Sequence, residues 1–299
     1  MQGNHNYIVL TDSACDLPQT MQKENGIEIL NFSIAVGDTA YFERQDFSPQ
    51  EFYEILREQD QIPTTSQITV DRFLNKFKEC DDAGCIQLLY ISINGSGSKT
   101  HSNAKVARNL FYDKHDSSKM EIHIVDSHSY SMGYGWYVAE ASQMLERGMD
   151  ITEVVRWLEE VFAKVEIVLA AYSLKHMKKS GRISAAAAIT GELLGIRPII
   201  SLNDGVSTVH KRVRGDHHVH PALIEHVETR RGNGFYMVGG TNEKDIAELA
   251  KLCQNRWGVK PAASFFLGSA VAANTGPDAI AIVFMGKPRV RRPAVQEEA

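Results

Sequence analysis

The sequence contains no long apolar run and little cysteine. No stretch approaches the roughly eighteen consecutive apolar residues of a membrane-spanning helix. Residues 1–6 lack a positively charged segment followed by an apolar one, so no secretory signal is expected. The four cysteines (Cys15, Cys80, Cys85 and Cys253) show no C-x-x-C spacing and are too few to staple 299 residues. We therefore expect reduced thiols and a cytoplasmic location.

Basic charge is also scarce. Lysine and arginine together number 32, against 37 for aspartate and glutamate, which gives a formal net charge of −5. Such a chain has no positive field for a phosphate backbone, and its main basic run lies near the end, at residues 287–293. Nucleic acid is not an expected partner.

The glycine-rich segment Gly95-Ser96-Gly97-Ser98 lacks the motifs that bind nucleotides or activate a serine. Lys99 follows at the wrong spacing for a P-loop, and Thr100 stands where a dinucleotide fingerprint needs its third glycine. Asn94 and Ser98 occupy the two positions that are glycine in a nucleophile elbow. The sequence therefore predicts no nucleotide cofactor and gives a serine hydrolase little support.

The composition is that of a folded protein. Hydrophobic residues make up 43% and charged residues 23%, an ordinary balance for a globular chain. A single hydrophobic core rarely grows beyond roughly 250 residues. A chain of 299 residues is therefore expected to form two domains.

The first half alternates strand and helix patterns. Short apolar runs predict buried strands at residues 7–10, 85–91 and 122–125. Ser48-Pro49-Gln50-Glu51 is a capping box that starts a helix, and apolar residues at helical spacing predict two more, over 70–77 and 132–145. This order predicts a parallel, Rossmann-like α/β domain.

The second half has a different pattern. Strand-like runs at residues 196–202 and 206–213 flank Asn203-Asp204-Gly205, a turn signal typical of an antiparallel hairpin. We therefore predict a two-domain α/β protein with a parallel N-terminal sheet, a mixed or antiparallel C-terminal sheet with helices, and a ligand between the domains. The predicted domains are residues 6–163 and 164–286, followed by a disordered tail at 287–299.

Four polar segments stand beside the predicted elements, in places where open α/β sheets bind ligands. They are Thr11-Asp12-Ser13, Thr64-Thr65-Ser66-Gln67, Asn94-Gly95-Ser96-Gly97-Ser98 and Asp126-Ser127. Glycine and hydroxyl residues at a helix start offer backbone amides and hydroxyl donors to an anion, such as a carboxylate or a phosphate. The alternative interpretation is that these serines and threonines only cap helices.

Positive charge gathers around Gly181 in the second half. Lys178, Lys179 and Arg182 surround this glycine. They form either a solvated surface or a group in which Arg182 faces an anion between the domains.

Three histidines, His217, His218 and His220, stand close together in the sequence. They lack an i, i+4 pair and a nearby carboxylate framework, so we expect exposed loop histidines and no metal site.

The order of these motifs resembles that of the DegV family. The matching segments are Thr11-Asp12-Ser13, Asp16-Leu17-Pro18, Thr64-Thr65-Ser66-Gln67, Ser96-Gly97-Ser98, Val125-Asp126-Ser127, Ser180-Gly181-Arg182-Ile183-Ser184, Arg197-Pro198-Ile199-Ile200 and Thr275-Gly276-Pro277. Each segment is common alone, but the ordered set is specific, and the resemblance covers about residues 6–286.

The resemblance implies two α/β domains that enclose one buried long-chain fatty acid. Hydroxyl groups of the first domain would hold the carboxylate, and the acyl chain would run into an apolar tunnel in the second. Some members of that family carry the fatty acid for a separate, ATP-dependent fatty acid kinase. The resemblance thus implies a binding protein with a kinase partner rather than an enzyme complete in itself, with no cofactor besides the ligand.

The residues expected to contact the ligand fall in five segments. They are Thr64, Thr65 and Ser66; Ser96, Gly97 and Ser98; Ser127; Arg182; and Asn274 with Thr275. Asn274 stands where the family usually has a histidine, and the segment after Gly97 is longer by one residue. An asparagine donates through its amide but does not titrate near neutral pH.

Two other functions stay open from the residues alone. One is a hydrolase or transferase that uses Ser96 with His101 or Asp126 on an acyl substrate, although the elbow motif is missing. The other is a non-catalytic regulator that binds another lipid or keeps an empty pocket.

Overall fold

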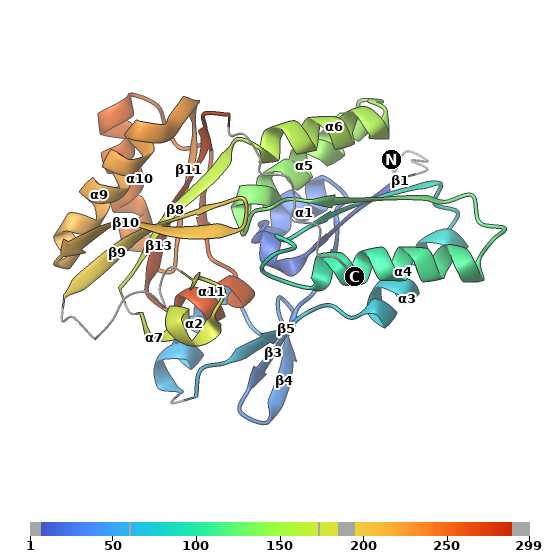
Figure 1. The fold of residues 1–299 in the computed structure, drawn as a ribbon, viewed down its shortest axis with the longest axis horizontal. Helices are drawn as coiled ribbons and strands as arrows, with labels where there is room; N and C mark the ends of the chain where they lie inside the picture. The colour runs from blue at the N-terminus through green and yellow to red at the C-terminus, as the bar shows by residue number, and fades with distance from the viewer. Residues whose placement is uncertain (1–6, 60, 173, 185–194, 289–299) are drawn as a thin grey trace, which may run out of the picture.

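The structure is a computed structural model that describes residues 7–59, 61–172, 174–184 and 195–288. They form two α/β domains along the long axis of the molecule (Figure 1). A parallel sheet builds the first domain and a mixed sheet builds the second, which confirms the predicted fold class. The division at residue 163 remains a prediction; the first strand of the second sheet begins at Val165.

The described strands number from β1 to β13 along the chain. They are Tyr7–Asp12 (β1), Glu28–Leu30 (β2), Ser33–Val36 (β3), Thr39–Phe42 (β4), Thr64–Ser66 (β5), Gln87–Ser92 (β6), Glu121–Asp126 (β7), Val165–Ala171 (β8), Ile196–Asn203 (β9), Val206–Arg214 (β10), Arg231–Gly240 (β11), Ser264–Phe266 (β12) and Ala279–Gly286 (β13).

The described helices connect and cover these strands. They are Ser13–Cys15 (η1), Gln19–Glu24 (α1), Pro49–Glu58 (α2), Val70–Asp82 (α3), Thr100–Lys114 (α4), Met132–Glu146 (α5), Ile151–Phe162 (α6), Lys175–Ser180 (α7), Asp216–His218 (η2), Val219–Arg230 (α9), Glu243–Trp257 (α10) and Ser269–Thr275 (α11).

The first sheet has the strand order β2-β1-β6-β7, and all its neighbours are parallel. Figure 1 shows α3 and α4 on one side of it and α5 and α6 on the other. A sheet covered on both faces needs strands that are apolar throughout, and in β6 Leu88, Leu89, Tyr90 and Ile91 are all fully buried. The loops after β1, β6 and β7 meet at one edge of this sheet, next to the second domain.

A local signal starts α2 where the sequence predicts it. The Ser48 side chain accepts a hydrogen bond from the amide of Glu51 at 3.3 Å, and the Glu51 carboxylate accepts one from the amide of Ser48 at 2.7 Å. The predicted capping box is therefore present, and it directs Phe52 and Leu56 into a buried cluster.

A small antiparallel sheet with the order β4-β3-β5 was not predicted from the sequence. Its strands are three or four residues long, and β5 pairs with β3 through Thr65 and Ile34, which lie far apart in the chain. Such short, non-local pairs leave no periodic pattern to detect. The segment taken as a polar loop at residues 64–66 is therefore an edge strand.

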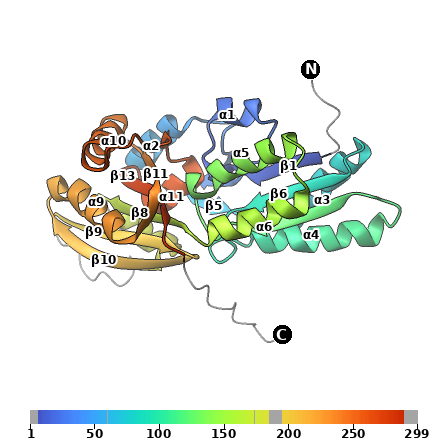
Figure 2. The same ribbon diagram turned by 90° about the horizontal axis from the view of Figure 1, so that it is seen from above.

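The second sheet has the order β10-β9-β8-β13-β11-β12, in which β11 and β12 are parallel and the other neighbours antiparallel. Alternate side chains of β13 point to opposite faces. Ile280, Ile282 and Phe284 pack in one cluster with α9 and α10, whereas Ala281 and Val283 join a core that both domains share. Figure 2 shows α9 and α10 at the end of the molecule remote from α3 and α4.

The predicted hairpin joins β9 and β10. Its turn residues Asp204 and Gly205 both have positive φ, 48° and 76°. Two consecutive positive φ angles are what a tight hairpin turn requires, and Asp and Gly are residues that adopt them.

The three neighbouring histidines do not share one environment. His217 and His218 are exposed in η2, whereas His220 is buried on α9, where its Nε2 lies 2.6 Å from Oδ1 of Asp245. The prediction of an exposed loop is therefore wrong for His220, because α9 begins at Val219 and packs against α10.

All four cysteines are free and buried. Cys15 lies in η1 and Cys253 on α10. Burial raises the pKa of Cys253 to about 12, and it raises the pKa of Cys15 as well. Both thiols are therefore protonated at neutral pH.

Among the described residues, no helix combines the length and the apolar character that crossing a membrane requires. Most of the tail predicted to be disordered, residues 289–299, lies outside the described part of the chain.

Candidate functional site

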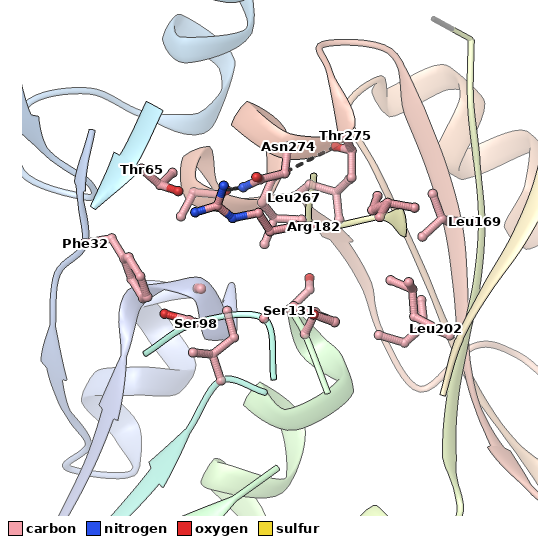
Figure 3. A pocket seen from close by; sticks show the side chains of 18 of the residues that line it. Phe32, Thr65, Ser98, Ser131, Leu169, Arg182, Leu202, Leu267, Asn274 and Thr275 are labelled. Atoms are coloured by element: carbon pink, nitrogen blue, oxygen red, sulfur yellow. Dashed lines mark hydrogen bonds between the residues drawn. The ribbon is translucent and has the colours of Figure 1, made fainter. Parts of the chain in front are cut away.

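A cavity of about 580 Å³ lies between the two domains. Its walls come from the loops after β1, β6 and β7, from β5, from α11, and from the inner strands of the second sheet. Figure 3 shows Phe32, Thr65 and Ser98 at one end and Leu169 and Leu202 at the other. The cavity therefore runs from polar loops of the first domain to the face of the second sheet.

The end against the second sheet is apolar. Ile167 and Leu169 of β8, Leu202 of β9, and Ala281 and Val283 of β13 line it. Aliphatic side chains offer no hydrogen bond, and burying a methylene group among them is worth about 0.8 kcal/mol. This end suits a hydrocarbon chain.

The opposite end carries three hydroxyl groups without a hydrogen-bond partner among the residues that the structure describes. They belong to Thr65 and Ser66 on β5 and to Ser96 between β6 and α4. Each hydroxyl can donate one hydrogen bond. Three donors from two separate elements are thus available to an acceptor in the cavity.

Other polar side chains of the wall are already engaged. The hydroxyl of Ser98 donates to Oγ1 of Thr100 at 2.9 Å, which fixes the start of α4. Nδ2 of Asn274 donates to the carbonyl oxygen of Ala270 at 2.7 Å, within α11. An amide carries two hydrogens, so Asn274 retains one for a ligand.

The charges around the cavity have one sign. Lys99 and Arg182 line it, and no aspartate or glutamate of the described chain does. Neither cation forms a salt bridge with a described residue, although Nη1 of Arg182 donates to the carbonyl oxygen of Ser180 at 2.6 Å. Both side chains are exposed, so the positive charge lies at the mouth of the cavity. An anionic group is the complement of this wall.

Close packing explains the glycines between β6 and α4. A β-carbon at Gly95 would lie 2.5 Å from Oδ2 of Asp126, and one at Gly97 would collide with the hydroxyl group of Tyr130. That hydroxyl group accepts a hydrogen bond from Nδ2 of Asn94 at 2.7 Å. Because they lack a β-carbon, the two glycines allow this loop to pack closely against β7 and against the loop that follows β7.

The β9–β10 hairpin reaches the same loop from the second domain. A β-carbon at Gly205 would lie 2.7 Å from Nδ2 of Asn94, so the backbone of the turn rests on that side chain. The hairpin therefore joins the two domains beside the cavity.

The side chains considered for a hydrolase are not arranged around Ser96. Nδ1 of His101 lies 2.9 Å from Oγ of Ser92 instead, and burial lowers the pKa of His101. Asp126 accepts hydrogen bonds from the amides of Gly95 and His128, at 3.1 and 2.8 Å. Ser96 thus lacks the neighbouring base that an activated nucleophile needs. Nowhere in the described ranges are three His, Cys, Asp or Glu side chains grouped to hold a metal ion.

Eight of the ten predicted ligand residues line the cavity. They are Thr65, Ser66, Ser96, Gly97, Ser98, Arg182, Asn274 and Thr275. Thr64, at the exposed start of β5, does not. Ser127 does not either, because it is fully buried and its hydroxyl group donates to the carbonyl oxygen of Ser129.

The sequence reasoning missed five polar residues of the wall: Gln67, Thr69, Lys99, Tyr130 and Ser131. Lys99 was noted only as a mismatch to a P-loop, yet it directly follows the hydroxyl-rich segment. Its adjacency to Ser98 was the available signal. Ser131 begins the segment Ser131-Met132-Gly133, which also matches the family, whereas Tyr130 left no signal beyond its position after β7.

The family comparison covers almost the whole chain. A model described as "Uncharacterised protein, DegV family" matches residues 7–287. A DegV domain-containing protein of Clostridium perfringens is 31% identical over 288 residues, which are 94% of this chain and 97% of that protein.

Solved structures with the same fold carry descriptions of ligands. A stearic acid-binding protein from Eubacterium ventriosum superimposes with a TM-score of 0.83 at 22% identity, over 93% of this chain and 98% of that one. A DegV family protein from Thermus thermophilus, described by its fatty acid binding, gives 0.81 at 24% identity, over 94% and 99%. A two-sheet fold with its cavity between the sheets, a family match from residue 7 to residue 287 and a relative 31% identical agree, and the chain belongs to the DegV family.

Proposed function

We propose that this protein binds a long-chain fatty acid in the interdomain cavity, with the carboxylate at the polar end and the acyl chain against the second sheet. The observation that carries the proposal is the polarity of the wall. Three unpartnered hydroxyl groups and two cations gather at one end, aliphatic side chains fill the other, and no acidic side chain of the described chain lines either.

The energetics favour such a ligand. A carboxylate is costly to remove from water unless donors replace its hydration, and Thr65, Ser66 and Ser96 are such donors. The tail contributes about 0.8 kcal/mol for each buried methylene, so most of the affinity comes from the chain. The hydroxyl groups then set the orientation of the acid.

We propose further that the bound acid is presented to a separate fatty acid kinase, as the family resemblance implies. Ser96, Lys99 and Arg182 are exposed, so a carboxylate beside them lies near the surface, within reach of another protein. The chain itself carries no nucleotide-binding motif at its glycine-rich loop.

The relatives and the cysteines agree with this function. The structural neighbours from Eubacterium ventriosum and Thermus thermophilus are described as binding stearic acid and a fatty acid. Four free, buried cysteines are usual in a reducing compartment, which supports a cytoplasmic location.

The direct test is to identify what the purified protein carries. The protein is denatured, extracted with organic solvent, and the extract is analysed by mass spectrometry; a fatty acid in a stoichiometric amount is expected. If delipidated protein also fails to bind any long-chain fatty acid in titration, the proposal is wrong.

A second test asks whether the polar end recognises charge. Lys99→Gln is expected to weaken binding of a fatty acid about threefold to tenfold and to leave binding of the matching fatty alcohol unchanged. Lys105→Gln, an exposed lysine of the same helix that does not line the cavity, is the control. Equal effects on acid and alcohol would place Lys99 outside the headgroup site.

A further inference from the structure

Two carboxyl groups outside the ligand wall converge at the start of α11. Asp16 follows η1 and Glu43 follows β4, and both are buried. A β-carbon at Gly268, just before α11, would collide with Oδ1 of Asp16 and lie 2.9 Å from Oε1 of Glu43. The two acids therefore meet at one point of the backbone.

Each acid also accepts hydrogen bonds from neighbouring groups. Oε1 of Glu43 accepts a hydrogen bond from the amide of Ala270 at 2.7 Å, and Oε2 accepts one from the hydroxyl of Ser13 at 2.5 Å. Oδ2 of Asp16 accepts a hydrogen bond from the hydroxyl of Ser131. Oδ1 of Asp16 is buried and has no hydrogen-bond partner among the described residues.

Arg44 attracts both acids electrostatically but forms no salt bridge with either. Arg44 lies nearest in the chain, but its guanidinium donates to the carbonyl oxygen of Leu17 at 2.7 Å and to Oε1 of Gln22 at 2.9 Å. No salt bridge within the described part of the chain reaches Asp16 or Glu43.

The backbone beside the pair is strained. Asp16 and Arg44 have positive φ angles of 53° and 66°, a conformation that tertiary contacts must hold.

Two like charges this close and this deeply buried are not both stable. Burial, and then the charge of Glu43, raises the pKa of Asp16 well above its ordinary value, and burial raises that of Glu43. One proton on Oδ1 of Asp16 would turn the unpartnered oxygen into a donor and leave a single charge at the start of α11.

The helix that this pair holds is a wall of the ligand cavity. Ala270, Val271, Asn274 and Thr275 of α11 line that cavity. On its other side, a second cleft of about 780 Å³ is lined by Asp16, Glu43 and Gly268, which gives solvent protons a route to the pair. We propose that Asp16 and Glu43 share one proton and act as positioning residues that hold α11 against the first domain, so that their charge state sets the affinity of the cavity for the fatty acid.

The direction in which stability and affinity change with pH follows from the raised pKa values. A buried acid whose pKa is raised binds its proton more tightly in the folded than in the unfolded state, so the stability that the pair contributes falls as the pH rises from about 4 through the raised value. At high pH the pair carries two charges, repulsion loosens α11, and the ligand is held less tightly.

Among the other groups that face the pair, Asp12 on β1 also titrates, because burial raises its pKa to about 6. The charge of Glu43 contributes to that rise, so the double variant lowers the pKa of Asp12 and moves its titration away from the tested window. The Arg44 guanidinium attracts both acids, and Cys15 in η1 and Tyr53 on α2 act electrostatically on one or both of them. A ligand carboxylate is fully ionised above about pH 6.

The test compares the pH dependence of fatty acid binding in three proteins, and it rests on the proposed function. From about pH 6 to about pH 8.5, the parent is expected to lose affinity about fivefold. The double variant Asp16→Asn/Glu43→Gln keeps the hydrogen-bond acceptors without charge and is expected to show a flat profile. Glu24→Gln, an exposed acid at the end of α1, should behave as the parent. Superimposable profiles for parent and double variant would overturn the inference.

A ligand-free measurement separates this inference from the proposed function. The infrared spectrum of the unliganded parent near neutral pH should contain a protonated carboxylic acid band that is absent from the double variant. If the parent binds no fatty acid at any pH, the proposed function fails, whatever the band shows. If the parent binds but no such band is found, the shared proton is wrong while the function stands. Should the double variant not fold, Glu43→Gln replaces it: Asp16 then lacks the neighbouring charge that raises its pKa, so its acid band and the loss of affinity are expected at lower pH than in the parent, and unchanged positions of both would overturn the inference.

Discussion

At the scale of single residues, the polar end of the cavity is distinguished by hydroxyl groups that have no hydrogen-bond partner among the described residues. These hydroxyl groups are exposed or half-buried in the cavity, so they are free to donate to a ligand. Thr65 and Ser96 come from different elements, and their convergence depends on the small β4-β3-β5 sheet.

Removing either hydroxyl group should weaken fatty acid binding without disrupting the fold. Thr65→Ala and Ser96→Ala are each expected to cost about 1–3 kcal/mol of fatty acid binding, because the carboxylate loses a charge-assisted hydrogen bond. Titration with a fluorescent fatty acid measures the loss. Ser117→Ala, at an exposed position away from the cavity, should bind as the parent does. Unchanged affinity in both variants would move the carboxylate elsewhere.

Asn274 offers a test of the headgroup position that depends on pH. An imidazole at this position can become positively charged beside a carboxylate, which raises its pKa. Asn274→His is therefore expected to bind the fatty acid more tightly on the acid side of a window between about pH 5.5 and about 7.5, relative to the parent.

Asn274→Gln, which does not titrate, is the matched control for that experiment. Affinity-versus-pH curves that coincide for the histidine and glutamine variants would mean that residue 274 does not touch the headgroup.

At the scale of elements, the loop between β6 and α4 is the most constrained part of the site. Its glycines are closely packed against Asp126 and Tyr130, and the hairpin turn rests on Asn94. A loop held from both domains keeps Ser96 in one place.

A side chain at position 97 should displace that loop. Gly97→Ala is expected to reduce fatty acid affinity and to lower the free energy of unfolding by about 1–3 kcal/mol, because its methyl group collides with the Tyr130 hydroxyl. Adding Tyr130→Phe removes the colliding oxygen and should restore part of both quantities, as measured by titration and by urea unfolding. An absence of rescue in the double variant would show that the collision is not the cause.

The elements that the sequence predicted are those with local signals. The capping box at Ser48 and the Asp204-Gly205 turn lie within a few residues of the structure they specify. The pairing of Thr65 with Ile34 and the meeting of Asp16 with Glu43 join distant segments, so no window of sequence contained them. The same difference explains the site: the hydroxyl segments were visible in the sequence, whereas the pairing of β5 with β3, which brings Thr65 to the cavity, needed the fold.

At the scale of the whole molecule, the cavity belongs to neither domain alone. The free hydroxyl groups of its polar end come from the first domain, whereas Arg182, Asn274 and the apolar end come from the second, so a bound ligand would contact both. Ligand that binds only the folded state raises the free energy of unfolding by about 2.7 kcal/mol at a hundred times its dissociation constant.

Chemistry on the bound acid is expected to need a second protein. The purified chain, given ATP, magnesium and a fatty acid, should form no acyl phosphate and hydrolyse no ATP, because its glycine-rich loop lacks the nucleotide-binding motifs. Mass spectrometry and a phosphate-release assay check both expectations. Acyl phosphate formed by the chain, free of any contaminating kinase, would contradict the proposed division of labour.

The reaction rates of the four buried thiols can report local opening of the structure. A protonated, enclosed cysteine reacts with a thiol reagent only when its surroundings open, so its labelling rate follows local unfolding. Cys15 directly follows Ala14, which lines the cavity. Cys253 is a buried residue of α10 and belongs to the cluster on the outer face of the second sheet. A ligand that closes the space between the domains would protect Cys15 more than Cys253, and the ratio of the two rates would distinguish opening of the cavity from unfolding of the whole chain.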